Sequence, residues 1–211
     1  LGGGSMPPPP PPSEAVLALA RRGGTEVMIE GTDVLVMAPD APGLLSSASG
    51  LLALHSLDVQ AADVRTVRGM AVNRFTVSPR FGELPEVALL NADLRRILAG
   101  TLALNERLRA KERAYRVAGP GHAAQPPRLL WFDDEATDAT VLEVRTRDAI
   151  GLLHRLTAAL ETAGTDIRSA RISSLGARVV DAFYLTDADG KPLSEPHQAQ
   201  VAETVLAALA G

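Results

Sequence analysis

The sequence predicts an α+β fold that is built twice. Each copy is expected to fold as a β-α-β-β-α-β unit, with both helices on one face of an antiparallel sheet. Two observations predict this fold: an internal repeat, and the same order of strand and helix patterns in both copies. Shifting the chain by 108 residues aligns residues 34–78 with residues 142–186 without a gap. The identical pairs include Val36/Val144, Asp40/Asp148, Gly43/Gly151, Asp58/Asp166 and Phe75/Phe183.

The elements of the second copy follow from hydrophobic periodicity. Residues 140–146 form a β-rich run, and residues 151–163 carry apolar side chains at the spacing of one helix face, ended by Gly164. Two further strands are expected over 167–174 and 178–185, joined by a turn around Gly176, and a last helix over 196–210 is opened by Ser194. The first copy repeats these patterns, with helices over 44–54 and 85–98 and strands over 34–37, 58–67 and 70–78.

The repeat divides the chain into domains and connecting segments. Residues 1–24 are predicted to be a flexible Gly/Pro-rich linker and a short helix that Ser13 caps, and residues 25–99 the first domain. Residues 100–127 form a connector that is charged and helical in its first part and Gly/Pro-rich in its second. The second domain covers residues 128–211.

The fourth strand of each unit is the weak point of this division. For the first unit the best candidate is Arg128–Phe132, beyond the connector; after the last helix of the second unit, no residues remain. A β-rich run at Glu26–Glu30 precedes the first copy and forms a hairpin with it through Gly31-Thr32-Asp33. Either this strand serves elsewhere in a shared sheet, or the second unit has three strands.

Composition excludes several classes of function. The net charge is −4 and only 3% of residues are aromatic, so the chain has neither the basic field nor the stacking platforms of a nucleic-acid-binding protein. It contains no cysteine, which agrees with a reducing cytoplasm, and no apolar run of the roughly 20 residues that cross a bilayer. We therefore expect a cytoplasmic protein with no nucleic-acid or membrane partner.

The turn before the first helix of each copy carries a family resemblance. The strings Ala38-Pro-Asp-Ala-Pro-Gly-Leu-Leu45 and Thr146-Arg-Asp-Ala-Ile-Gly-Leu-Leu153 resemble the Asp-Arg-Pro-Gly-Leu-Leu signature of ACT domains, which have the ferredoxin-like fold. Residues 164–173 and 178–187, with the acidic segment Trp131–Glu135, resemble the C-terminal tandem ACT region of bacterial uridylyltransferase/uridylyl-removing enzymes. Those enzymes modify the nitrogen-signalling PII protein.

The departures from the family pattern are informative. Ala41 and Ala149 replace the signature arginine, and Ile150 replaces the proline in the second copy. The family's nucleotidyltransferase and metal-dependent phosphohydrolase domains, for which the resemblance implies Mg, lie upstream of the ACT pair and have no counterpart among these residues. We therefore expect a regulatory fragment with no cofactor, no metal site and no catalytic residues of its own, which acts on attached catalytic domains and, through them, on PII.

The expected ligand site lies at the strand-to-helix turn. Gly43 and Gly151 let the backbone approach a ligand closely, and the free N–H groups at the helix starts, Leu44 and Leu152, can bind a carboxylate. Asp58 and Asp166 begin the next strands and are candidates to receive an α-ammonium group. Asp40 and Asp148 complete the predicted ligand-binding set.

Simpler roles exist for the same residues. Asp40 and Asp148 are also suited to cap the helices that follow, and Asp58 and Asp166 to serve as turn residues. The resemblance implies that the ligand is an amino acid, with glutamine expected, which binds between ACT units and shifts the balance of the attached activities. A ligand-free interaction or dimerisation module is the alternative.

Overall fold

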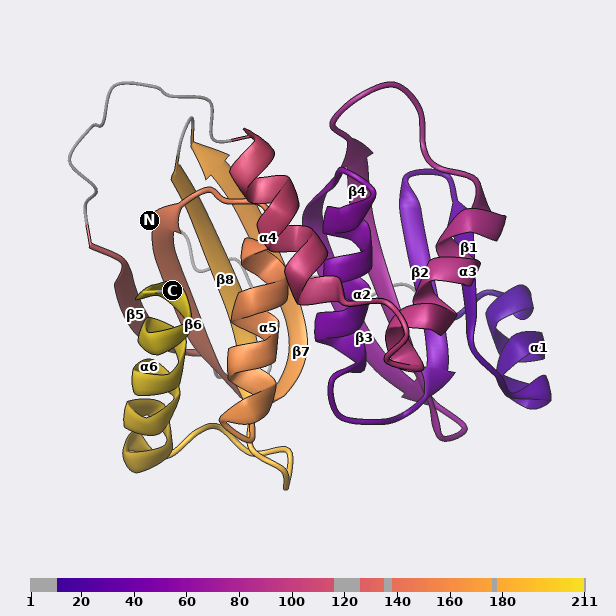
Figure 1. Cartoon of the computed structure of the whole chain (residues 1–211). Helices are drawn as coiled ribbons and strands as arrows, with labels where there is room; N and C mark the ends of the chain where they lie inside the picture. The colour runs from indigo at the N-terminus through magenta and orange to yellow at the C-terminus, as the bar shows by residue number, and fades with distance from the viewer. Residues whose placement is uncertain (1–10, 116–125, 135–137, 176–177, 211) are drawn as a thin grey trace.

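A single antiparallel sheet runs through the whole molecule. The computed structural model describes residues 11–115, 126–134, 138–175 and 178–210. Within these ranges eight strands are hydrogen-bonded in the order β1-β2-β4-β3-β7-β8-β6-β5 (Figure 1). Four strands come from each half of the chain, and the α+β fold of two tandem ferredoxin-like units is confirmed.

The two units have the same elements at equivalent positions. The first comprises β1 (Glu26–Glu30), β2 (Asp33–Pro39), α2 (Leu44–Leu54), β3 (Leu57–Val67), β4 (Met70–Pro79) and α3 (Val87–Leu98). The second comprises β5 (Arg128–Asp134), β6 (Ala139–Arg147), α5 (Leu152–Thr162), β7 (Asp166–Leu175), β8 (Arg178–Thr186) and α6 (Glu195–Ala210). Two helices, α1 (Glu14–Arg22) and α4 (Leu104–Tyr115), stand outside the repeat. The predicted helix over 44–54 matches α2 at both ends, and the predicted helix over 151–163 is one residue longer than α5 at each end.

The fourth strand of each unit precedes the unit in the chain. The prediction that Arg128–Phe132 completes the first unit is wrong, because β5 pairs with β6 from Arg128↔Arg145 to Asp134↔Ala139. In the first unit β1 takes the same edge position beside β2. A hairpin delivers an edge strand locally, without a long connection, and periodicity cannot distinguish an edge filled from the N-terminal side from one filled from the C-terminal side. The spatial strand order remains ferredoxin-like.

The units join where β3 meets β7. The ladder contains the pairs Ala61↔Arg171, Ala62↔Ala170 and Asp63↔Ser169. Ala62 and Ala170 are equivalent in the repeat, so this pairing lies on a pseudo-two-fold axis. Arg171 donates to the Asp63 carboxylate at 3.2 Å and strengthens the junction. The two ferredoxin-like units therefore pair within one chain.

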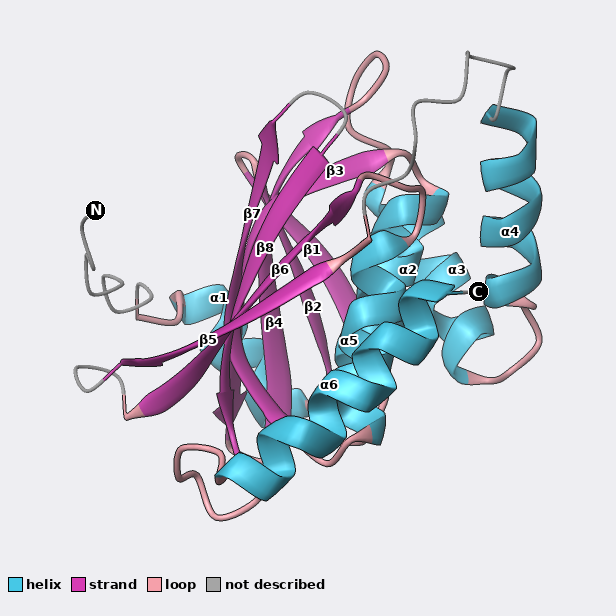
Figure 2. Cartoon of the chain, turned by 90° about the vertical axis from the view of Figure 1, so that its left-hand side faces the viewer, coloured by secondary structure: helices cyan, strands magenta, loops and turns pink. Residues whose placement is uncertain are grey.

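The four helices that belong to the repeat form one layer on one face of the sheet (Figure 2). Figure 2 shows the sheet nearly edge-on, with α2, α3, α5 and α6 on the same side. At the centre of this layer α2 and α5 lie side by side (Figure 1), and His154 Nδ1 on α5 lies 2.7 Å from the Ser46 carbonyl oxygen on α2. Gly50 allows this approach: a Cβ there would lie 2.5 Å from Leu104 Cδ2 and 3.0 Å from His154 Nδ1.

Helix α4 crosses the junction on top of the helix layer. Leu104 and Leu108 are buried against Ala53 and Leu54 of the first unit and Ile150 of the second. The predicted charged helix of the connector is therefore present, and its apolar stripe holds both units.

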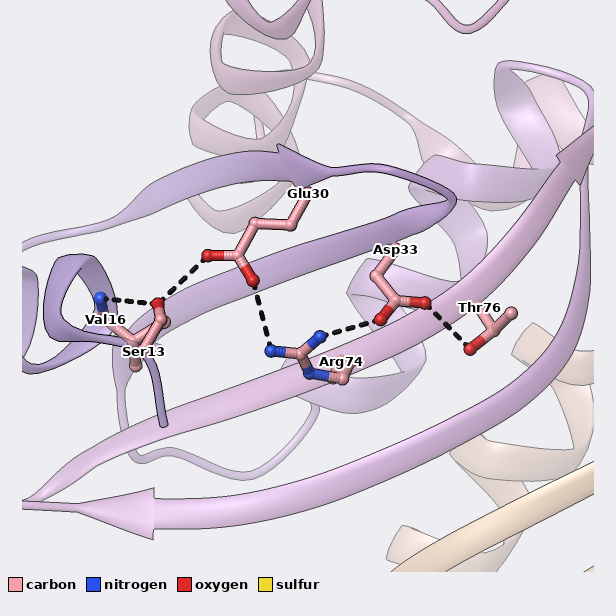
Figure 3. A network of polar contacts seen from close by, with 6 residues as sticks. All are labelled: Ser13, Val16, Glu30, Asp33, Arg74 and Thr76. Atoms are coloured by element: carbon pink, nitrogen blue, oxygen red, sulfur yellow. Dashed lines mark hydrogen bonds and ion pairs between the residues drawn. The ribbon is translucent and has the colours of Figure 1, made fainter. Parts of the chain in front are cut away.

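Helix α1 covers the opposite face of the first unit's sheet. Val16, Leu19 and Ala20 pack on Leu35, Met37, Met70 and Val72. Figure 3 shows how its start is held: the Ser13 hydroxyl caps Val16 N–H and donates to Glu30, which pairs with Arg74. The predicted role of Ser13 as the N-cap is confirmed.

Some predicted features lie outside the described residues. They are the linker over residues 1–10, the Gly/Pro-rich part of the connector up to residue 125, Glu135 of the acidic segment and the turn at Gly176. Among the helices that the structure describes, none is long and apolar enough to cross a membrane.

Leu156 tests the common core of the two units. Its side chain is 0% exposed on α5, beneath the centre of the helix layer. Leu156→Ala is expected to lower the free energy of unfolding by about 2–5 kcal/mol, because it removes buried methyl groups and leaves a cavity. Urea denaturation measures this loss. Leu206→Ala on α6, where the side chain is 41% exposed, is the matched control, and an equal loss in both variants would contradict the assignment of the core.

Candidate functional site

A pocket lies at the junction of the two units. It has a volume of about 370 Å³, within the range of roughly 300–1,000 Å³ that is usual for small-molecule sites. The first unit contributes the end of α2 and the start of β3, and the second contributes the turn between β6 and α5. We call this the Asp58 pocket; Asp58, Arg80, Asp148, Gly151, Leu152 and Asp181 are among its lining residues.

The turn between β6 and α5 presents a free helix start to this pocket. Gly151 is the N-cap of α5, with a left-handed backbone at φ 74°, and no side chain caps the helix. Gly43 has the same role at α2, with φ 84°. The alternative that Asp40 and Asp148 cap these helices is therefore wrong. The first-turn N–H groups of α5, unlike those deeper in the helix, have no intrahelical acceptors and favour a negative group.

An arginine brings aspartates of both units together. Arg80 follows β4 and donates to Asp58 at 2.6 Å through Nη2, while the same nitrogen lies 3.9 Å from Asp148. The hydrogen bond to Asp58 is the main reason that the pKa of Arg80 is raised, with desolvation acting against it. Because all three side chains are about a third to a half exposed, the ion pairs are reachable by a polar ligand.

Asp181 is the most perturbed group in the pocket. Its side chain points from β8 toward the helix layer, is only 2% exposed, and has an oxygen, Oδ1, with no hydrogen-bond partner among the described residues. Burial, and then repulsion from Asp148, raises its pKa to about 7. A buried carboxyl group with one unpartnered oxygen, in a pocket, is a candidate to bind a polar ligand.

Helix α4 forms the roof of the pocket. The Lys111 ammonium donates to the carbonyl oxygens of Ala53 and Leu54 and to the Ser56 hydroxyl, at 2.6–2.8 Å, and so caps the end of α2. Desolvation, followed by repulsion from Arg80, lowers the pKa of Lys111. At the end of α4, Tyr115 lines the pocket and stacks on Phe81, with ring centroids 6.3 Å apart.

A second pocket lies at the pseudo-symmetric position. It also measures about 370 Å³, and it joins the turn between β2 and α2 to the start of β7. We call it the Asp166 pocket. Asp40, Leu44, Asn73 and Asp166 line it, at the positions equivalent to Asp148, Leu152, Asp181 and Asp58.

The predicted site residues meet across the junction. Asp148, Gly151 and Leu152 of the second unit share the first pocket with Asp58 of the first unit, and Asp40 and Leu44 share the second pocket with Asp166. Gly43 is close by in sequence but is not a lining residue. Each turn therefore faces the aspartate of the other unit.

Sequence reasoning missed the cations and the buried acid. Asp181 could have been found, because it interrupts the inward-facing apolar positions Val179, Phe183 and Leu185, and Asn73 interrupts the equivalent strand. Arg80 and Lys111 gave no such signal, since they lie outside the regular patterns of strand and helix. No group of three or more metal-ligating side chains that could hold an ion occurs within the described ranges. The chemistry available here is the binding of a small polar molecule.

Asp181 makes stability depend on pH. Its pKa is raised from 3.8 to about 7, so the folded state holds a proton that the unfolded state releases, and the free energy of unfolding falls as pH rises between these values. Asp181→Asn keeps the shape of the side chain and removes its charge. Asn is also the residue at the equivalent position of the first unit, Asn73. The variant is expected to equal the native chain near pH 4 and to exceed its stability by up to about 4 kcal/mol at pH 8.

Chemical denaturation at both pH values measures this difference. Asp133→Asn, at an exposed position on β5, is the control and is expected to change stability by less than about 0.5 kcal/mol. An Asp181→Asn effect of the same size at pH 4 and pH 8 would contradict the protonated carboxyl.

Known proteins resemble this chain over most of its length. No family model matches it. It is 41% identical over 179 residues to the bifunctional uridylyltransferase/uridylyl-removing enzyme of Streptomyces coelicolor, covering 82% of this chain and 21% of the relative. The enzymes of the same name from Mycobacterium tuberculosis and Rhodospirillum rubrum are 36% and 33% identical, over 88% and 92% of this chain. Among solved structures, an unknown protein from Galdieria sulphuraria shares 16% sequence identity with this chain, and its structure matches with a TM-score of 0.27, which supports no inference.

The chain spans about a fifth to a quarter of the length of these relatives, since it covers 21%, 25% and 22% of them. Together with the fold of two tandem ferredoxin-like units, the matches relate this chain to a region of the bifunctional uridylyltransferase/uridylyl-removing enzymes.

Proposed function

We propose that this chain is the amino-acid-sensing regulatory part of a bifunctional uridylyltransferase/uridylyl-removing enzyme. In this proposal glutamine binds between the two ACT units and changes the balance of the attached activities toward the PII protein. The module itself carries no catalytic residue and no cofactor, and Mg is needed only by the catalytic domains. The module acts in the cytoplasm.

The observation that carries the proposal is the composition of the Asp58 pocket. The free start of α5 suits the α-carboxylate of an amino acid. The carboxylates of Asp58 and Asp148 also line this pocket, and their negative charge suits the α-ammonium group of the amino acid. Asp181 holds an oxygen with no partner in the described structure, which a third polar group of the ligand would satisfy.

The position of the pocket supports regulation. A ligand that touches Asp58 and the turn before α5 adds a link between two units that also meet through the β3–β7 ladder, the packing of α2 on α5, and α4. Such a ligand binds the state in which the units are joined better than a state in which they are displaced, and only such a difference in affinity shifts an equilibrium. Tyr115, at the end of α4, also lines the pocket, so a bound ligand contacts the connector between the units directly.

Isothermal titration calorimetry of this chain with glutamine tests the proposal. We expect saturable binding, and at about 100 times the Kd a rise in the free energy of unfolding of about 2.7 kcal/mol. Asp58→Ala is expected to weaken binding at least tenfold, because the ammonium group loses its acceptor. Glu203→Ala, which removes one negative charge from an exposed position on α6, should leave the Kd unchanged. Glutamate and other amino acids are the ligand controls, and binding of none of them would overturn the proposal.

An interaction module is the second candidate function. β5 forms one edge of the sheet, and Phe132 on it is 50% exposed. The opposite edge is partly closed, because the Asn91 amide bonds both the N–H and the carbonyl oxygen of Val27 on β1, at 2.9 and 3.0 Å. Sedimentation velocity distinguishes the two candidates: dimerisation that depends on protein concentration and that glutamine leaves unchanged, without heat of binding, would favour the interaction module.

A further inference from the structure

The two junction pockets share a backbone but differ in side chains. The repeat places Asp58 opposite the turn before α5, and Asp166 opposite the turn before α2. Both helix starts have a glycine N-cap in the left-handed conformation and no side-chain cap from their own turn. A difference in ligand binding between the pockets therefore comes from the lining side chains that differ between the two copies.

Glu161 is the divergent residue at the anion-binding position. It lies in the last turn of α5 and lines the Asp166 pocket. The backbone of Leu45 and Ser46 and the Ser46 side chain act to lower the pKa of the Glu161 carboxyl, against the larger effect of burial, so this carboxyl lies near the start of α2. Its Oε2 atom has no hydrogen-bond partner among the described residues. Leu45 and Ser46 are the second and third residues of α2, whose N–H groups have no acceptor within the helix. A carboxyl group from the other unit thus lies beside the helix start at which the α-carboxylate of a ligand would bind.

Ala53 stands at the equivalent position in the Asp58 pocket. Its side chain ends at Cβ, so it has no group that reaches the N–H groups of Leu153 and His154 at the start of α5. The anion-binding position of that pocket is consequently left for a carboxylate from solution.

The charges of the pockets agree with this difference. The Asp166 pocket is lined by three acidic side chains, Asp40, Glu161 and Asp166, and its lining residues in the described structure include no Lys or Arg. In the Asp58 pocket Arg80 and Lys111 face the acids Asp58, Asp148 and Asp181. The carboxylate of a ligand is therefore repelled from the Asp166 pocket and accepted in the Asp58 pocket.

We propose that Glu161 is a built-in carboxylate that closes the Asp166 pocket to amino acids, so that this chain binds ligand only in the Asp58 pocket. The inference rests on the proposed function. It adds the number of ligand molecules that one chain binds and the residue that sets this number. Glu161 acts as a covalently attached competitor whose effective concentration is fixed by the packing of α5 against α2. The burial of this group raises its pKa, which is consistent with a carboxylate held away from solvent.

Calorimetry with glutamine on three forms of the full chain tests this inference. The native chain is expected to bind one glutamine. Glu161→Ala, which makes the Asp166 pocket resemble the Asp58 pocket, is expected to bind two. Ala53→Glu, the reciprocal change, places a carboxylate at the start of α5 and is expected to weaken binding at least tenfold.

The outcomes separate this inference from the proposed function. Two bound molecules in the native chain, or no additional molecule in folded Glu161→Ala, would overturn the role of Glu161 and leave glutamine sensing intact. Binding to Glu161→Ala with none to the native chain would support Glu161 as a plug and contradict the native sensor, whereas no binding to either form would overturn both. Circular dichroism reports whether Glu161→Ala has folded after losing its contacts to α2. If it has not, Ala53→Glu decides: glutamine bound with unchanged affinity by that variant would overturn the inference.

Discussion

The pairing of β3 with β7 is the interaction on which the rest of the structure depends. The ladder is short, and it is centred on Ala62 and Ala170, where small side chains keep the junction free of bulk. It turns two ferredoxin-like sheets into one and places α2 beside α5. Both pockets exist only because this pairing sets the turn of one unit against the first strand residue of the other.

Helix α4 gives that junction a second support. Its apolar stripe contacts both units, Lys111 closes the end of α2, and the Asn105 side chain lies 2.7 Å from His154 on α5. The segment that connects the units in sequence is thus also a brace across them. The Asp58 pocket is lined by the start of β3, by the turn before α5 and by Lys111 and Tyr115 of α4. A small molecule in it would therefore contact both units and the brace together.

The duplicated backbone has diverged at the positions that matter for binding. In the repeat Asp181 corresponds to Asn73, Ala53 to Glu161, and Arg80 to Ala188. These changes leave the core unaltered, because Phe75 and Phe183 are both fully buried in equivalent strands. Within one fold, therefore, one pocket is lined by two cations and by the buried Asp181, while the described lining of the other carries acidic side chains and no Lys or Arg.

The sequence by itself determined the repeat, the fold class, the bounds of α2, those of α5 to within one residue, and the turns with Gly43 and Gly151, because hydrophobic periodicity and glycine positions are local properties of the chain. Tertiary structure alone decided which strand fills each sheet edge, so that β5 joined the second unit instead of the first. It also decided that Asp58 meets Asp148, that Arg80 and Lys111 enter the pocket, and that Glu161 reaches α2. These contacts join residues that are far apart in the chain, and their geometry is fixed by the packing of one unit on the other, which no local pattern encodes.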